Sequence, residues 1–113
     1  MVFNSTTLAT NLTSTECLAR VTKDEILISA SDDATGPDGE YRLLVGVQGF
    51  SVGTHPANLV VFLEASNGYL QLDAPNEGFE VEILEYGNVG QTINGRFNYQ
   101  GTEIGTFIAD RIQ

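Results

Sequence analysis

The strongest candidate for chemistry in this sequence is an acidic loop, residues 31–40, which reads SDDATGPDGE. Carboxylate oxygens grouped on a flexible loop are the ligands that Ca²⁺ takes from proteins. Four side chains could supply them: Asp32, Asp33, Asp38 and Glu40. The EF-hand spacing, with glycine sixth and glutamate twelfth, is absent, and a turn held by side-chain to backbone hydrogen bonds explains the same residues. The sequence favours such a turn, and calcium is the only cofactor for which it offers candidate ligands.

The remaining titratable residues do not assemble into a catalytic site. Glu80 and Glu82 share the polar face of one expected strand, whereas a catalytic acid needs apolar surroundings to raise its pKa. His55 is the only histidine, and no pattern places a carboxylate and a nucleophile beside it. The sequence also contains no nucleophile elbow, phosphate loop or dinucleotide-binding fingerprint. We therefore expect a protein that is not an enzyme.

Cys17 is the only cysteine, so an internal disulfide is impossible and zinc spacing fails. A small buried side chain is the expected role, and pairing between two chains stays open.

Tyrosines offer one possible binding surface, because an aromatic ring with a polar tip suits a sugar-binding face. The chain has four of them: Tyr41, Tyr69, Tyr86 and Tyr99. It has no tryptophan, and packing in the core or at sheet edges explains the same residues.

Charge and length restrict the possible partners. The 113 residues fit a single domain with a substantial core. A formal charge of −10 repels phosphate backbones and anionic lipid, which excludes nucleic acid and favours cations or basic partners. No apolar run approaches the ~18 residues that a membrane span needs. The chain also lacks a secretory signal, so we expect a cytosolic protein or a mature chain from which the signal was removed.

Apolar residues recur at every second position over most of the chain, which is typical of strands with one buried face. The last third, residues 78–113, shows this best, with turns expected at Gly87-Asn88 and Gln100-Gly101. Residues 49–57 are expected to form a loop that contains Pro56. Expected strands cover residues 16–21, 25–30, 41–48, 58–65, 69–73, 79–86, 93–99 and 104–112. A helix from Ser14 to Arg20 competes with the first of them.

About eight short strands predict an all-β domain over residues 16–113. We expect an antiparallel β-sandwich, because the segments are uneven and prolines interrupt them, and a closed antiparallel β-barrel is the alternative. Residues 1–15 are expected to be an extended lead-in that pairs with an edge strand of its own chain or of a neighbour.

Four motifs in residues 49–111 resemble those of small, uncharacterised secreted or lipid-anchored β-sandwich proteins of Bacteroidetes. They are Gly53-Thr54, Tyr86-Gly87, the Ile93, Gly95 and Phe97 strand, and the Gly105 and Phe107 strand. His55 stands where those proteins carry an aromatic residue after Gly-Thr. The resemblance implies an extracytoplasmic β-sandwich, secreted or on the cell surface, and brings no catalytic residues.

Two functions remain open. The first is a non-catalytic extracytoplasmic module that binds a protein or glycan partner or mediates adhesion. The second is a structural subunit of an oligomer, filament or virion that assembles through residues 1–15 or through sheet edges.

Overall fold

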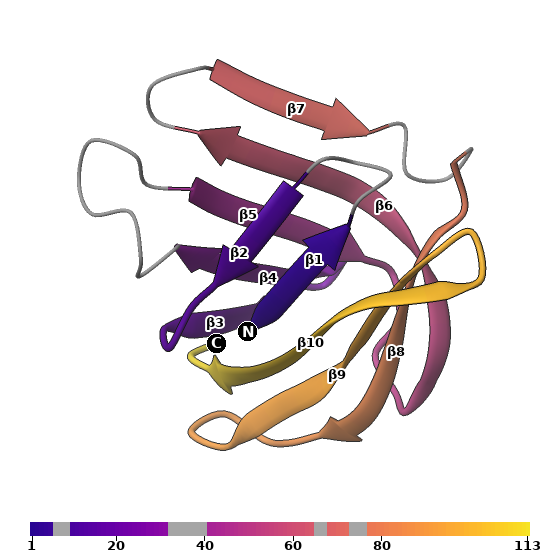
Figure 1. Ribbon diagram of the computed structural model, residues 1–113. Coiled ribbons are helices and arrows are strands. Elements are labelled where there is room, and N and C mark those ends of the chain that lie inside the picture. Colours follow the sequence, from indigo (N-terminus) through magenta and orange to yellow (C-terminus); the bar gives the residue numbers. More distant parts are fainter. Residues whose placement is uncertain (6–9, 32–40, 65–67, 73–76) are drawn as a thin grey trace.

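The computed structural model describes residues 1–5, 10–31, 41–64, 68–72 and 77–113. The ten elements assigned there are all strands, so the predicted all-β class is confirmed (Figure 1). They are β1 (Val2–Ser5), β2 (Thr10–Thr13), β3 (Cys17–Val21), β4 (Ile26–Ser31), β5 (Tyr41–Val47), β6 (Gly53–Glu64), β7 (Gly68–Leu72), β8 (Phe79–Tyr86), β9 (Thr92–Tyr99) and β10 (Thr102–Arg111).

Seven of these strands close into a barrel. Going round the ring, β3, β4, β5, β6, β8, β9 and β10 each pair with the next, and β10 returns to β3. The β10 to β3 pair is parallel, with Asp110 opposite Leu18 and Arg111 opposite Ala19. The predicted sandwich is therefore wrong, and the barrel alternative fits, although one parallel pair makes the barrel mixed.

A long strand makes closure possible. β6 has 12 residues and changes its neighbour along its length, pairing with β8 through Gly53–Pro56 and with β5 from Ala57 onward. Pro56 therefore lies inside a strand opposite Glu80, and the predicted loop over residues 49–57 is wrong from Gly53 onward. Bulges in β6, β8 and β10 supply the local bends.

The chain's first strands form a hairpin that packs on its own barrel. β1 pairs with β10 through Val2 opposite Thr106 and Phe3 opposite Gly105, and β2 pairs with β1. Of the two partners that the sequence allowed for residues 1–15, the structure thus uses the chain's own β10. Cys17–Val21 is strand β3, so the competing helix over Ser14 to Arg20 is wrong.

Every-other-residue burial places an aromatic cluster inside the barrel. Phe3 is 1 % exposed, and its ring centroid lies 5.9 Å from that of Phe97 and 6.3 Å from that of Phe79. Phe97 in turn stacks on Phe107 at 4.9 Å. The first strand therefore supplies a central core side chain rather than an appendage.

The barrel has two ends, which we name here. The loop end is made by residues 22–25, 48–52, 87–91 and 112–113, where β3, β5, β8 and β10 finish. The pocket end is the opposite one, where β9 turns into β10 at Tyr99–Thr102 and β1 finishes at Ser5.

Candidate functional site

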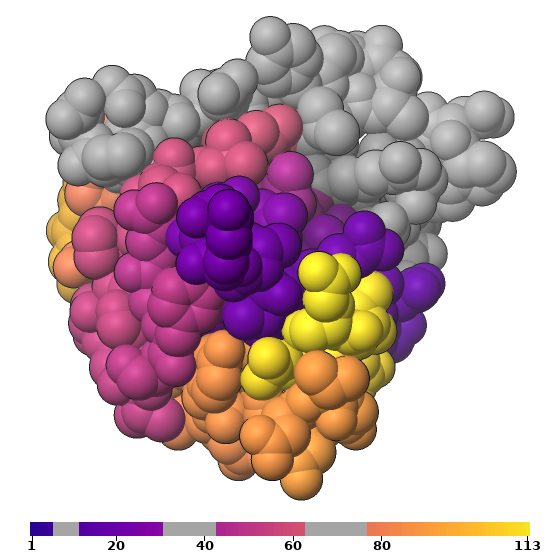
Figure 2. Space-filling view, turned by 180° about the vertical axis from the view of Figure 1, so that it is seen from behind, coloured from indigo at the N-terminus to yellow at the C-terminus, as the bar shows by residue number. Residues whose placement is uncertain are grey.

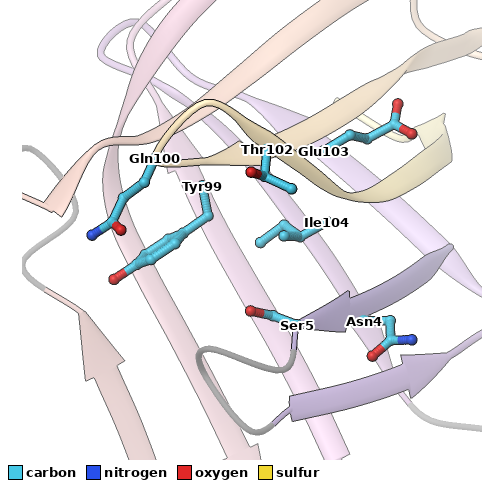
Figure 3. Close-up of a pocket in the computed structure, with 7 residues that line it drawn as sticks. All are labelled: Asn4, Ser5, Tyr99, Gln100, Thr102, Glu103 and Ile104. Carbon is cyan, nitrogen blue, oxygen red and sulfur yellow. The ribbon is translucent and has the colours of Figure 1, made fainter.

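A cavity of about 250 Å³ opens at the pocket end, between β1 and the start of β10 (Figure 3). Seven described residues line this cavity, called here the β1–β10 pocket: Asn4, Ser5, Tyr99, Gln100, Thr102, Glu103 and Ile104. They come from one short strand, one hairpin turn and the beginning of one long strand, so the fold brings together segments that lie about a hundred residues apart.

The pocket exists because two paired strands separate. Pairing between β1 and β10 stops at Phe3 opposite Gly105, where a Cβ on Gly105 would lie 2.5 Å from the carbonyl oxygen of Val2. Glycine therefore permits the closest approach just where the ladder ends. Beyond it, β10 has a bulge between Glu103 and Gly105, while Asn4 and Ser5 remain paired with β2.

The hairpin turn between β9 and β10 forms the opposite wall. Tyr99 pairs with Thr102, and the two residues between them, Gln100 and Gly101, have φ angles of 51° and 83°. This is the left-handed geometry of a two-residue hairpin turn, which favours Gly, Asn or Asp at both positions. The backbone N–H of Gln100 donates to the carbonyl of Gly78 at 3.0 Å. Gln100 occupies a conformation that costs a non-glycine residue about 1–2 kcal/mol.

The lining is polar and mostly uncharged. Ser5 and Thr102 carry hydroxyls, and Asn4 and Gln100 carry amides, so all four can both donate and accept hydrogen bonds. Figure 3 shows Ile104 between Thr102 and Ser5, where it gives the cavity an apolar surface. These groups suit a neutral ligand with several hydrogen-bonding atoms.

The single charge in the lining is directed away from the cavity. The carboxylate of Glu103 lies 3.5 Å from Nη1 of Arg96, whose Nε lies 3.6 Å from Glu82, and Figure 3 shows Glu103 pointing outward. The seven described lining residues include no lysine, arginine or histidine. The pocket therefore offers an anion no cationic partner.

The structure places two of the four predicted tyrosines at opposite ends. Tyr99 is 7 % exposed, lines the pocket and packs edge-on against Phe79 at 6.3 Å. Tyr86, opposite Ile93 near the loop end, lies under the guanidinium of Arg111 at 5.2 Å. These two do not share a site. The backbones of Tyr41 and Tyr69 lie near the pocket end, and their side chains fall outside the described residues.

The predicted calcium ligands Asp32, Asp33, Asp38 and Glu40 lie outside the described residues. Within the described ranges, no three His, Cys, Asp or Glu side chains gather closely enough to hold a metal ion.

The other reactive side chains are engaged elsewhere. Cys17 is 3 % exposed, and burial raises the pKa of its thiol to about 11 despite the nearby positive amino terminus. His55 lies at the loop end, with its Nε2 2.8 Å from the carbonyl oxygen of Ser51 and its ring against Gly49. Glu82 faces Arg96, as expected for a carboxylate on a wet sheet face.

Sequence reasoning missed most of the pocket. Of its lining, only Tyr99 was a candidate. Asn4 and Ser5 lie in a segment whose apolar spacing matched neither helix nor strand, and Gln100 was predicted only as a turn residue. A glutamine in a turn that demands a left-handed backbone was the one available signal.

The loop end carries a different kind of surface. Five of the seven large apolar side chains exposed among the described residues are found there or near the end of β8: Phe50, Val52, Leu84, Val89 and Ile112. Figure 2 shows magenta, orange and yellow segments meeting on the lower half of this face. Backbone hydrogen bonds join the turn after β8 to the end of β10, as from Gly90 to Arg111 at 3.0 Å, and the C-terminal residues to β3, as from Ile112 to Ala19 at 3.0 Å.

Comparison with protein families, curated proteins and solved structures finds no match. None of the described residues forms a helix of the length and apolarity that crossing a bilayer demands.

Proposed function

We propose that this chain is a non-catalytic extracytoplasmic binding module, and that it holds its ligand in the β1–β10 pocket. The proposal rests on the separation of β1 from β10 beyond Phe3 and Gly105, which opens a cavity of about 250 Å³ lined by hydroxyl and amide side chains. A rigid β-scaffold with a polar recess at one end is a common design for recognition.

The chemistry of the pocket supports binding rather than catalysis. Its three hydroxyls, on Ser5, Tyr99 and Thr102, share the described lining with no histidine or lysine that could activate them. Its one carboxylate, on Glu103, is half exposed and faces Arg96. The extracytoplasmic location rests on the resemblance described above.

A matched pair of substitutions tests the site. Thr102→Tyr places a bulky side chain at the pocket, whereas Thr106→Tyr places the same side chain on the exposed face of the same strand. Tyrosine suits a strand at both positions, so both variants should fold. We expect Thr102→Tyr to weaken binding at least tenfold for ligands found by screening glycan and peptide libraries, with Thr106→Tyr unchanged.

Amide chemical shifts of the ¹⁵N-labelled chain would report the binding. Perturbations that center on residues 99–104 and disappear in Thr102→Tyr support the proposal. A ligand whose perturbations lie elsewhere, with equal affinity in both variants, contradicts it.

Assembly is the second candidate function, and one observation favours it. β2 ends the strand order and β7 pairs only with β6, so each has one neighbour within the described sheet. Such edges can pair with another chain. Deleting residues 1–15 is a poor test, because it would remove Phe3 and Leu12 from the core. Light scattering of the unchanged chain over a concentration series is the better one: a constant monomer mass contradicts assembly.

A further inference from the structure

The properties of the β1–β10 pocket indicate the chemical class of its ligand. This inference rests on the proposed binding function and deepens it. Three properties of the described lining decide the class: the size of the cavity, the sign of its charges, and the arrangement of its hydrogen-bonding groups.

Size limits the ligand to about one ring. The cavity holds about 250 Å³, below the roughly 300–1,000 Å³ of pockets that bury a drug-sized molecule. A long extended peptide or an oligosaccharide would therefore project beyond it, and only a terminal unit would enter.

Charge disfavours anions. Glu103 is the only ionised group in the described lining, and the chain as a whole carries −10. An anionic group would enter a negative field without a cationic partner. Arg96 accompanies Glu103 on the outer face, where its guanidinium also faces Glu82.

The hydrogen-bonding groups match a polyol. Thr102, Asn4 and Gln100 are exposed and can each donate and accept hydrogen bonds, and a sugar hydroxyl also does both. Ile104 and the ring of Tyr99 provide an apolar surface for the C–H face of a sugar ring. Such a combination of a few placed polar groups over an apolar surface is typical of small-molecule sites.

Gln100 has a special place in this arrangement. Asparagine or glycine would meet the turn's left-handed backbone at lower cost, yet the chain carries a longer amide there, and the backbone hydrogen bond to Gly78 fixes the position. Figure 3 shows its side chain descending beside Tyr99. Gln100 is exposed and lines the cavity beside the Tyr99 ring, so the turn places an amide at the rim of the pocket at the expense of its own conformational preference.

We propose that the pocket binds one uncharged sugar unit at the end of a glycan, and that Gln100 is a specificity-determining residue that hydrogen-bonds its hydroxyls. Binding at a single ring should be weak, with a dissociation constant on the order of 1 mM.

The test titrates the ¹⁵N-labelled chain with methyl glycosides of neutral hexoses, with a sugar acid, and with blocked neutral dipeptides. We expect saturable shifts at residues 99–104 with a neutral hexose glycoside and none with the sugar acid. Gln100→Gly, which keeps the turn and removes the amide, should weaken the sugar at least fivefold. Its melting temperature should equal or exceed that of the unchanged chain, which shows that the loss is not due to unfolding.

The outcomes separate the sugar from the site itself. If dipeptides or the sugar acid bind at residues 99–104 and neutral sugars do not, the sugar assignment is overturned and the pocket stands. If a neutral sugar binds with equal affinity to Gln100→Gly, the role of Gln100 is overturned. If no probe shifts residues 99–104, both the sugar assignment and the pocket are contradicted.

Discussion

The two ends of the barrel differ in how their backbone segments are connected. At the loop end, hydrogen bonds connect segments from distant parts of the chain, such as Val21 to Gln113 at 3.1 Å and Arg111 to Gln91 at 2.9 Å. At the pocket end, the ladder between β1 and β10 stops after Phe3 and leaves a polar cavity. The end whose backbone is joined exposes apolar side chains, whereas the end whose strands separate exposes hydroxyls and amides.

The contrast indicates which end suits recognition of a small polar molecule. Polar side chains that line a gap between two strands can turn toward a ligand, whereas backbone groups already joined across segments cannot. The apolar residues of the loop end are single side chains on turns or beside a bulge, and scattered exposed apolar side chains are normal on protein surfaces.

The largest expected effect compares the core aromatic side chain of β1 with an exposed aromatic side chain at the loop end. Phe3→Ala should cost about 3–5 kcal/mol of unfolding free energy, because Phe3 is 1 % exposed and contacts the rings of Phe79 and Phe97. Phe50→Ala at the loop end should change it by about 0.5 kcal/mol or less, since Phe50 is 44 % exposed.

Urea denaturation measures both values. If Phe3→Ala folds too poorly to measure, Phe3→Leu should still be clearly less stable than Phe50→Leu. Equal losses for the two positions would mean that β1 is not part of the core, and the pocket would lose one of its walls.

Cys17, at the start of β3, should make the free energy of unfolding depend on pH. Burial raises the pKa of its thiol from 9.0 to about 11, so between these values the unfolded chain loses a proton that the folded chain keeps. The unfolded state is therefore favoured as pH rises, and stability should fall by about 1.4 kcal/mol per pH unit in that window. Below pH 9 the thiol is protonated in both states and contributes no slope.

The control is Cys17→Ala, which removes the thiol without adding a charge. The unchanged chain should lose stability between pH 9 and 11 more steeply than this variant when urea curves are compared. Cys17 should also resist thiol reagents at pH 8, since the reactive thiolate is scarce and the side chain is 3 % exposed. Rapid labelling at pH 8 would show that the core beside β3 opens readily.

The sequence predicts those features of the fold that depend on neighbouring residues better than those that depend on residues far apart in the chain. Period-two alternation in residues 79–86 and 93–99 predicted β8 and β9 correctly, because side-chain direction along a strand is a local property. The turn at Gln100-Gly101 was likewise predicted from its residue types. Both follow from neighbours in sequence.

Closure was predicted only as the alternative to a sandwich, and the pocket was not predicted, because both depend on distant partners. Ring closure needs β10 beside β3 in parallel, through Asp110 opposite Leu18, and alternation gives the buried face of a strand without giving its neighbour. The pocket needs Gly105 to meet Val2 and the bulge that follows. Nothing near Asn4 or Ser5 in sequence signals that β10 will separate from them.

The smallest expected effect tests whether the hydrogen bonds of Arg111 stabilise the loop end. Nη1 of Arg111 donates to the carbonyl of Gly87 at 2.9 Å, its Nε donates to that of Gln113 at 3.0 Å, and its guanidinium lies over Tyr86. Arg111→Met keeps an unbranched side chain and removes both donors, so unfolding free energy should fall by about 1–2 kcal/mol. Arg20→Met, an exposed position on β3, should change it by about 0.5 kcal/mol or less.

Amide exchange localises the effect. Because Arg111 ties β10 to the turn after β8, the amides of Gly90 and Ile112 should exchange faster in Arg111→Met, while that of Phe3 should be unaffected. An increase spread equally over both ends would mean that the barrel opens as one unit. The two ends would then differ in geometry but not in local stability.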